Sequence, residues 1–454
     1  MLAGPSAIQH ADAKTSHGKR IQETEDRRQK AEIEGELSAV SCQQSARFSV
    51  QRSESEPRVP VEVGKDTSVA DFGFSVTGRD GLARRGELCT PHGVVQTPAF
   101  MPVGTRGAVK ALTHRDVSAL GADIILGNTY HLYLRPGDGL IGRAGGLHRF
   151  IGWDRPILTD SGGYQIFSLA ERRRISEAGA EFRSHIDGSL HLLTPESVAD
   201  IQLQLGSDIA MVLDECIATP ASVAVTRTSM ERSVRWARRA RARWRQVVAD
   251  PAGSGVLVTN PGQAQFGIVQ GGTHLELRTE SVQATVDIGF EAYAVGGLSV
   301  GEPPPLMYEV VAHTAAQLPA ALPRYLMGTG MPDDLIECVA AGIDLFDCVL
   351  PTRNARNGQL LTSRGPISIK NARYAEDRLP PDPDCRCYTC SNFSRAYLRH
   401  LFTTGEMTAA TLNSLHNLYF YLDTMRRIRE AIVFGSFDRL RLEFHQTFSR
   451  RPRH

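Results

Sequence analysis

Eight short apolar runs constrain the fold of this chain more than any other feature of its sequence. Each run ends near residues such as Gly, Asp, Asn or Thr, and helical patterns occupy segments between them. Consecutive apolar residues are typical of strands that are buried on both faces of a parallel sheet. The runs lie at 98–105, 122–129, 155–163, 208–216, 265–272, 291–302, 324–330 and 344–351.

The intervening segments predict crossover helices. Residues 229–248 place apolar side chains near one helix face, and residues 331–341 form another helical segment. Thr194 is a suitable N-cap for a helix that opens at Pro195. Eight strands with crossover helices predict an α/β fold, a (β/α)8 TIM barrel with functional residues at the strand ends. A doubly wound open sheet is the alternative, but no GxGxxG turn or P-loop supports it.

The composition limits the class of protein and its expected domain division. Its 454 residues are 41% hydrophobic and 22% charged, as in ordinary globular proteins. No apolar run approaches about 18 residues and the N-terminus lacks a signal-like stretch, so we expect no membrane span and a cytoplasmic location. Residues 1–70 are polar and predict a disordered extension. The catalytic barrel is expected over 71–378, with its final helix contributed from the C-terminal part. A zinc-binding subdomain and C-terminal helices are expected over 379–454.

Two further segments have helical patterns. Residues 227–245 contain eight arginines, which indicates either a solvated helix face or a face that contacts phosphate. Residues 412–433 predict a long helix suited to packing and self-association.

Cys385, Cys387 and Cys390 form a motif typical of a metal site. Thiolates at this spacing bind one ion from a tight turn, and a helix-borne imidazole can supply the fourth ligand. Three sulfurs and one nitrogen make a closed tetrahedral zinc site, which leaves no position for a reacting water and is therefore structural. Spacing alone leaves three candidates for the imidazole: His400, His416 and His445.

Polar groups at the strand ends form a set suited to binding a nucleobase. Asp160 ends one run and precedes two glycines, which allow a ligand to approach the backbone, and Tyr164 is placed to stack on a flat ring. Asp214 and Gln270 end two later runs, and Gly297 offers bare backbone groups. Ordinary turn chemistry explains each of these alone. Their shared position at barrel strand ends favours a site that reads the edge of a base.

Asp347 lies inside the last apolar run, and a basic loop with Arg353 and Arg356 follows it. An aspartate after a strand is most often a cap or a salt-bridge partner. Together with Asp160, it indicates a second role, in which one carboxylate attacks an anomeric carbon and the other moves a proton. This division is the chemistry of retaining glycoside transfer.

The chain resembles the bacterial-type tRNA-guanine transglycosylases, also called queuine tRNA-ribosyltransferases, from Phe72 to its C-terminus. The resemblance rests on the motifs TDSGGYQ, LDEC, IVQGG, VGGLSVGE, YLMGTG, FDCVLPTRNARNG and CRCYTC followed by a histidine, in that order. It implies a zinc-containing (β/α)8 barrel and exchange of guanine for a 7-deazaguanine at the wobble position of tRNAs with GUN anticodons (Tyr, His, Asn, Asp). It also implies a homodimer with one structural Zn²⁺ per subunit.

The resemblance also implies residue roles. Asp347 matches the nucleophile, which attacks ribose C1′ and holds the tRNA covalently, and Asp160 matches the general acid–base. The positions that match base-binding residues are Asp160, Ser161, Gly162, Gly163, Tyr164, Asp214, Gln270, Gly297, Leu298 and Met327. The positions that match RNA-binding residues are Gly328, Thr329, Gly330, Met331, Pro332, Asp333, Asp334, Thr352, Arg353, Asn354, Ala355 and Arg356. The matching metal ligands are Cys385, Cys387, Cys390 and His416.

Two residues discriminate within the family. Val300 stands where eukaryotic members usually have glycine, and Cys216 belongs to the bacterial form of its motif. We therefore expect 7-aminomethyl-7-deazaguanine, the queuosine precursor, as the incoming base. Ser299 departs from the alanine that bacterial members often have. The alternatives are a transglycosylase that uses queuine itself and a catalytically silent tRNA-binding partner subunit, although both aspartates are present.

Overall fold

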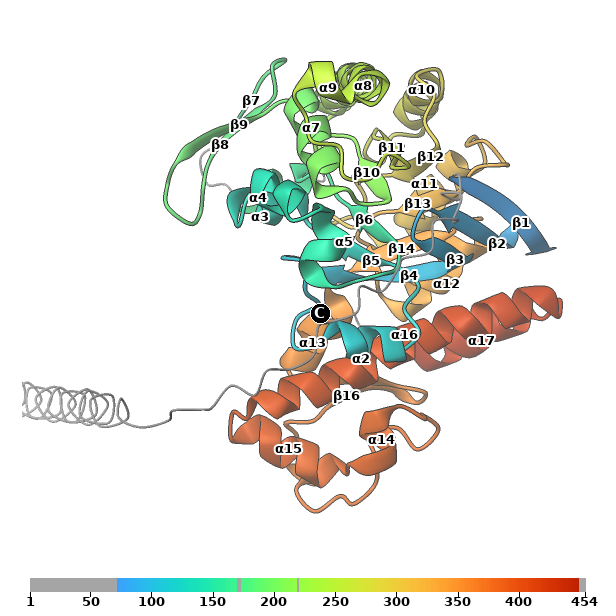
Figure 1. Cartoon of the computed structure of the whole chain (residues 1–454). Helices are drawn as coiled ribbons and strands as arrows, with labels where there is room; N and C mark the ends of the chain where they lie inside the picture. The colour runs from blue at the N-terminus through green and yellow to red at the C-terminus, as the bar shows by residue number, and fades with distance from the viewer. Residues whose placement is uncertain (1–71, 170–172, 219, 449–454) are drawn as a thin grey trace, which may run out of the picture. The chain divides into compact units, whose positions relative to one another are not determined.

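A closed barrel of eight parallel strands organises the part of the chain that the computed structural model describes, residues 72–169, 173–218 and 220–448 (Figure 1). Each strand coincides with one of the eight apolar runs, so the predicted (β/α)8 barrel is confirmed. Strand β14 pairs with β4 and closes the ring. The barrel strands are β4 (Ala99–Gly104), β5 (Ile125–Gly127), β6 (Ile157–Thr159), β10 (Ile209–Met211), β11 (Ala264–Val269), β12 (Ala292–Val295), β13 (Arg324–Leu326) and β14 (Leu345–Cys348).

Helices cover the outside of the barrel, so both faces of the strands are buried. Every residue of β11 and of β12 is buried. The main crossover helices are α7 (Pro195–Leu205), α8 (Val223–Ala249), α10 (Leu275–Val286), α11 (Pro304–Ala315) and α12 (Pro332–Ala340). Shorter helices are α2 (His114–Ala119), α3 (Thr129–Leu134), α4 (Asp138–Arg143), α5 (Gly146–Ile151), α6 (Gly163–Leu169) and α9 (Pro251–Ser254).

The predicted helix starts are confirmed where capping chemistry sets them. Thr194 caps α7: its hydroxyl accepts the amide N–H of Ser197 at 3.0 Å, and the Ser197 hydroxyl accepts the N–H of Thr194 at 2.9 Å. The helix expected over 229–248 is longer, because Ser222 caps α8 and the helix starts at Val223, six residues earlier.

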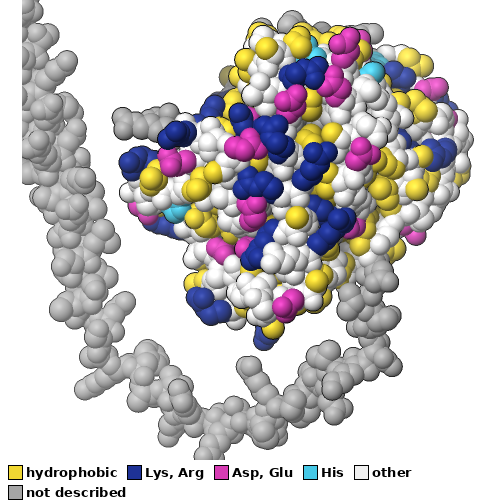
Figure 2. All heavy atoms as spheres, turned by 90° about the horizontal axis from the view of Figure 1, so that it is seen from above, with side chains coloured by type: hydrophobic (Ala, Val, Ile, Leu, Met, Phe, Trp, Pro, Cys, Tyr) yellow, Lys and Arg dark blue, Asp and Glu magenta, His cyan; other side chains and the backbone are white. Residues whose placement is uncertain are grey.

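The arginine-rich segment lies on α8, and six of its arginines pair with carboxylates of other elements. The pairs are Arg227–Glu280, Arg232–Glu215, Arg235–Glu177, Arg239–Glu196, Arg241–Glu291 and Arg243–Asp200. Figure 2, which views this side of the molecule, shows acidic side chains interleaved with the basic ones. Three of these pairs, those of Arg227, Arg235 and Arg239, remain well exposed, in agreement with a solvated helix face. The pairing with carboxylates favours this interpretation over a face that contacts phosphate.

Three smaller sheets surround the barrel. One contains β1 (Gly73–Asp80), β2 (Ala83–Thr90) and β3 (Gly93–Thr97), and another contains β7 (Arg173–Ile175), β8 (Ala180–Arg183) and β9 (Leu190–Leu193). The third is the hairpin of β15 (Gln359–Thr362) and β16 (Gly365–Ser368).

The C-terminal part builds a small core of its own. Leu360, Ile369 and Leu398 are fully buried in a cluster separate from the barrel core. Its long helix runs between the barrel and the hairpin (Figure 1). The helices here are α13 (Leu350–Arg356), the 3-10 helix η1 (Ala372–Tyr374), α14 (Tyr388–Asn392), α15 (Arg395–Thr403), α16 (Met407–Val433) and α17 (Phe437–Phe448). The long helix expected over 412–433 is thus part of α16.

The expectation of a disordered extension over residues 1–70 concerns residues outside the described ranges. None of the described helices combines the length and apolar character that crossing a membrane requires.

A buried ion pair joins β2 to the N-terminal end of the barrel. Arg84 and Asp344 are both fully buried, with Arg84 Nε 3.0 Å from Asp344 Oδ1. Arg84 also donates to the carbonyls of Ala320 at 2.8 Å and Leu322 at 2.9 Å, and Asp344 accepts the N–H of Arg324 at 2.7 Å. Every charged atom here has a partner, so removing one side leaves a buried charge alone.

We expect Arg84→Met to lower the free energy of unfolding by about 3–5 kcal/mol, because Asp344 then stays buried without its cation. Urea denaturation measures this value. The matched control is Arg426→Met, since Arg426 forms an exposed pair with Glu430 and its loss should cost at most about 1 kcal/mol. Equal losses in the two variants would contradict the role of the buried pair.

Candidate active site

The carboxyl ends of the barrel strands bring the predicted site residues together. Asp160 directly follows β6, Gln270 follows β11, and Asp347 lies in β14. Asp214 lies beyond β10 and Gly297 beyond β12. In a parallel barrel these positions share one rim, which is where barrel enzymes place their chemistry.

Asp160 is held by donors from the end of β5. Its Oδ1 accepts the N–H of Thr129 at 2.8 Å, and its Oδ2 accepts Asn128 Nδ2 at 2.5 Å. The carboxyl group keeps some solvent exposure, yet protein surrounds it, and this burial raises its pKa to about 7. The Thr129 N–H lowers the pKa, and the nearby charge of Asp347 raises it. Asp160 therefore exchanges a proton near neutral pH.

Asp347 has neutral donors and no cation beside it. Its Oδ1 accepts the Tyr325 hydroxyl at 2.6 Å and the N–H of Gly328 at 2.8 Å. Burial raises the pKa of Asp347, and these two hydrogen bonds lower it. The pKa of Tyr325 lies well above its ordinary value because of burial and the adjacent Asp347, so Tyr325 remains a donor. Sequence reasoning missed Tyr325, whose only local signal is a hydroxyl inside an apolar strand.

Asp214 and Gln270 form a hydrogen-bonded pair beside these carboxylates. Asp214 Oδ2 accepts Gln270 Nε2 at 2.6 Å, and Oδ1 accepts the Ser161 hydroxyl at 3.2 Å. Burial raises the pKa of Asp214 to about 6, against the lowering effect of both hydrogen bonds. Gly297 has a φ of 67°, and a Cβ there would lie 2.2 Å from Gln270 Oε1, so only glycine fits.

Arg278, a second residue that sequence reasoning missed, positions this pair. It is fully buried on α10, and its guanidinium donates to the carbonyls of Gly272, Val269 and Gly296 at 2.8, 2.9 and 2.8 Å. Two of these carbonyls directly precede Gln270 and Gly297. Burial without a carboxylate partner lowers the pKa of Arg278 to about 9. A helical arginine has no local pattern that reveals such a role.

The remaining predicted positions differ in accessibility. Tyr164 is 53% exposed on α6, and Met327 is partly buried at the end of β13. Arg353 is exposed on α13 and Arg356 partly so. Of the positions matched to RNA binding, the buried ones are Thr329, Gly330, Pro332, Asp333, Asp334, Thr352 and Ala355. The side chains among them are therefore packed inside the protein and not presented to solvent.

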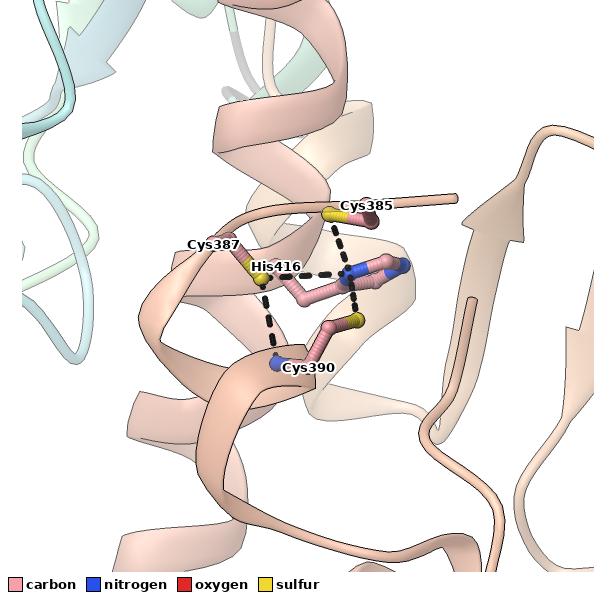
Figure 3. A group of neighbouring side chains, drawn as sticks. All are labelled: Cys385, Cys387, Cys390 and His416. Atoms are coloured by element: carbon pink, nitrogen blue, oxygen red, sulfur yellow. Dashed lines mark hydrogen bonds between the residues drawn. The ribbon is translucent and has the colours of Figure 1, made fainter. Parts of the chain in front are cut away.

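The four predicted metal ligands meet between α14 and α16 (Figure 3). His416 Nδ1 lies 3.7, 3.6 and 3.3 Å from the sulfurs of Cys385, Cys387 and Cys390. His416 Nε2 donates to the carbonyl of Leu361 at 2.7 Å, which leaves Nδ1 as the ligand atom. Hydrogen bonding among the sulfurs lowers the pKa of Cys387 and raises that of Cys390. Three thiolates this close together repel one another unless a cation lies among them. The cluster fits a metal ion.

The metal cluster is tied to the rim through α16. Asn417, next to His416, accepts the N–H of Leu361 at 3.0 Å and donates to the carbonyl of Pro351 at 3.0 Å. Asn413 donates to the carbonyl of Ala355 at 3.3 Å. Both acceptors lie on α13, the helix that carries the exposed arginines, so the cluster fixes the position of α13.

Two aspartates of perturbed pKa at the C-terminal rim of a closed barrel define a (β/α)8-barrel enzyme. Residues 80–450 match the family model described as queuine tRNA-ribosyltransferase. The chain is 54% identical over 375 residues to the queuine tRNA-ribosyltransferase of Nitratidesulfovibrio vulgaris, covering 83% of this chain and 97% of that protein. It is 57% identical over 364 residues to that of Oleidesulfovibrio alaskensis, covering 80% and 93%. The chain belongs to the queuine tRNA-ribosyltransferase family, and it is a transferase.

We expect Tyr325→Phe to reduce turnover in the family's transfer reaction by one to two orders of magnitude. The change removes one of two donors to Asp347, and a hydrogen bond to a charged group contributes about 1.5–3 kcal/mol. The measurement is kcat at saturating tRNA. Tyr293→Phe is the matched control, since Tyr293 is also buried in a barrel strand but bonds to backbone groups near Phe290. An unchanged kcat for Tyr325→Phe would contradict this role.

Proposed function

We propose that the protein replaces guanine at the wobble position of tRNAs with GUN anticodons (Tyr, His, Asn, Asp) by 7-aminomethyl-7-deazaguanine. The observation that carries this proposal is the pair of aspartates with different surroundings. Burial raises both pKa values, that of Asp160 to about 7. Asp347 accepts both of its neutral donors on Oδ1, whereas Asp160 accepts one donor on each oxygen. One group is suited to attack and the other to proton transfer.

The reaction is a double displacement at ribose C1′. Asp347 forms a bond to C1′ as the bond from C1′ to guanine N9 breaks, and Asp160 supplies the proton that the departing guanine takes up. The incoming base then attacks the same carbon, displaces Asp347 and returns its proton to Asp160. Two inversions retain the configuration.

The Asp214–Gln270 pair and the glycine backbone are the base-recognition groups of this proposal. With Gln270 Nε2 and Ser161 already bound to Asp214, the pair is fixed before a base arrives. A preformed set of donors and acceptors favours one hydrogen-bonding edge and rejects others. Tyr164 and Met327 sandwich the ring, with Leu298 contributing its backbone. Arg353 and Arg356 on α13 read the bases beside the wobble nucleotide.

Serine at position 299, where bacterial relatives often have alanine, is compatible with 7-aminomethyl-7-deazaguanine as the incoming base. Its hydroxyl lies 2.7 Å from Thr329 Oγ1, and its backbone N–H donates to Glu302. Because both groups already have partners, replacing alanine by serine adds no free polar group to the pocket. Val300 narrows the pocket on the side where queuine carries its larger substituent, which supports the precursor over queuine.

We further propose that the Cys3His cluster holds one structural Zn²⁺ per subunit. Three thiolates and an imidazole match the preference of zinc and saturate a tetrahedral ion. The homodimer expected from the resemblance and the cytoplasmic location expected from the composition belong to the same proposal.

The decisive experiment traps the intermediate. Native protein incubated with tRNA-Tyr and quenched in denaturant should run as a protein–RNA adduct on a denaturing gel, and Asp347→Asn should form none while still binding tRNA. The matched control, Asp138→Asn, alters another partly buried acid on α4 and should leave the adduct intact. An adduct in Asp347→Asn would refute the assignment of Asp347 as the nucleophile.

Exchange of labelled base in tRNA-Tyr, run with each deazaguanine in turn, tests the choice of incoming base. A preference for queuine would refute the proposed 7-aminomethyl-7-deazaguanine.

The raised pKa of Asp160 predicts a pH dependence. Guanine departs with a proton from Asp160, so single-turnover release of labelled guanine should fall as the pH rises through about 7, where that proton is lost. Burial raises the pKa of Asp160 from 3.8 to about 7 in the folded state, so the fold loses stability as the pH rises from about 4 to about 7. Asp160→Asn should therefore gain stability relative to native protein above about pH 7. A flat rate profile would contradict the assignment.

A further inference from the structure

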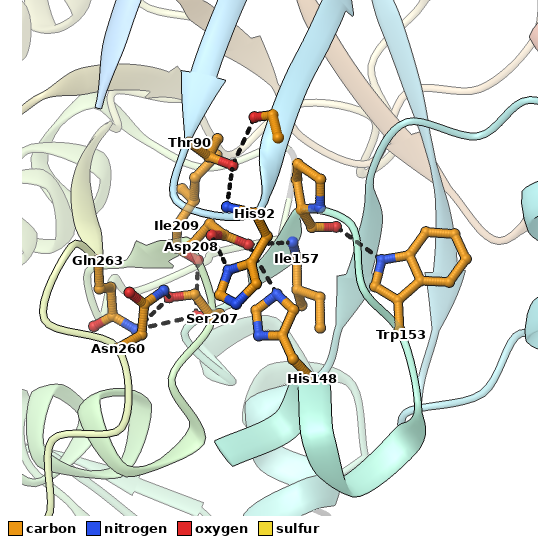
Figure 4. Close-up of polar contacts among 12 residues, drawn as sticks. Thr90, His92, His148, Trp153, Ile157, Ser207, Asp208, Ile209, Asn260 and Gln263 are labelled. Carbon is orange, nitrogen blue, oxygen red and sulfur yellow. Dashed lines mark hydrogen bonds and ion pairs between the residues drawn. The ribbon is translucent and has the colours of Figure 1, made fainter. Parts of the chain in front are cut away.

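Two histidines and an aspartate meet at the barrel end opposite the candidate active site (Figure 4). His92 lies in the turn between β2 and β3, His148 lies on α5, and Asp208 immediately precedes β10. Their ligand atoms all lie within 4.8 Å of one another. Among the described residues, only the Cys3His cluster forms another such group of histidine, cysteine and acidic side chains.

Asp208 is a rigid centre for this group. It is fully buried; its N–H donates to the carbonyl of Ile157 at 2.8 Å, and its own carbonyl accepts the N–H of Ala264 at 2.8 Å. Its Oδ1 lies 2.6 Å from His92 Nδ1 and its Oδ2 lies 3.0 Å from His148 Nε2. Oδ2 also accepts the N–H of Ile157 at 2.8 Å. The carboxylate is therefore held by barrel backbone, independently of the two rings.

The two imidazoles converge on this carboxylate from different segments. Their rings stack with centroids 3.5 Å apart and 12° between the planes. Each ring directs one nitrogen to a different oxygen of Asp208. Two imidazole nitrogens and a fixed carboxylate therefore face one small space, as the ligands of a single divalent cation do.

The donor set and its accessibility fit a transition metal. Imidazole nitrogens and one carboxylate oxygen suit Zn²⁺, Co²⁺, Ni²⁺ or Fe²⁺, and three protein ligands leave positions for water. The side chain of His92 is 33% exposed and that of His148 is 11% exposed. An open depression of about 610 Å³ is lined by His148, Trp153 and Asp154, so His148 also borders solvent on that side.

We propose that His92, His148 and Asp208 bind one divalent transition-metal ion, separately from the Cys3His cluster. The ion bonds to the ring nitrogens that now face Asp208, and each neutral ring keeps its single proton on the opposite nitrogen. Any second ring proton passes to solvent. Binding would require the two stacked rings to rotate apart so that both face the ion. His92 is the more exposed of the two, so its side chain is the freer to rotate. The bound ion links the β2–β3 turn, α5 and the start of β10.

Cobalt titration of protein whose Cys3His cluster is saturated with Zn²⁺ tests this site. We expect one further equivalent of Co²⁺ per chain, with visible d–d absorption but no thiolate-to-cobalt charge-transfer band. The Tm should rise with Co²⁺ concentration, because the ion binds only the folded chain.

Variants identify the ligands. His92→Gln and His148→Gln should each lower the affinity for the additional Co²⁺ ion by at least about 100-fold. The matched control is His313→Gln, since His313 bonds to the carbonyl of Leu275 on a distant helix pair and should leave cobalt binding unchanged. His92→Gln changes a turn residue and keeps the test valid even where His148→Gln fails to fold. The proposal would be overturned if native protein bound no additional Co²⁺ ion, or if His92→Gln bound that ion as tightly as native protein.

Discussion

The pairing of β14 with β4 is the contact on which the rest of the molecule depends. Leu345 lies opposite Ala99 and Asp347 opposite Met101 in this parallel pair. Closure leaves only β4 and β5 between β14 and β6, the strands that carry Asp347 and Asp160. In an open sheet four strands would separate them, and their charges would not interact. The raised pKa of Asp160 is thus partly a consequence of barrel closure.

The two ends of the barrel use buried aspartates in opposite ways. Asp344 and Asp347 belong to the same strand region, three residues apart. Asp344 has a bidentate arginine and a backbone donor, so its charge is matched and serves to hold β2 against the barrel. Asp347 has only neutral donors and no neighbouring cation. A fully paired carboxylate stabilises the fold, whereas an unpaired one at the rim keeps its charge available for chemistry.

The metal cluster and the rim are parts of one structure although they lie in different cores. His416 and Asn417 are neighbours on α16; one belongs to the cluster and the other holds the carbonyl of Pro351 on α13. Closed coordination of a metal would therefore fix α16, and through it the helix that presents Arg353 and Arg356. This arrangement would explain why an enzyme whose proposed chemistry needs no metal has a cluster that fits one.

The sequence by itself determined the strands, the caps and the metal motif, because each depends on residues close together in the chain. Eight apolar runs became eight strands, Thr194 capped its helix, and three cysteines shared one turn. Spacing left three histidines open and the resemblance chose His416; the tertiary structure then placed its ring among the cysteines. Only the tertiary structure paired the arginines of α8 and placed Tyr325 and Arg278 beside the site residues. It also brought His92 to Asp208 across 116 residues. These partners come from distant segments that share no local pattern, so the tertiary fold decides which of them meet.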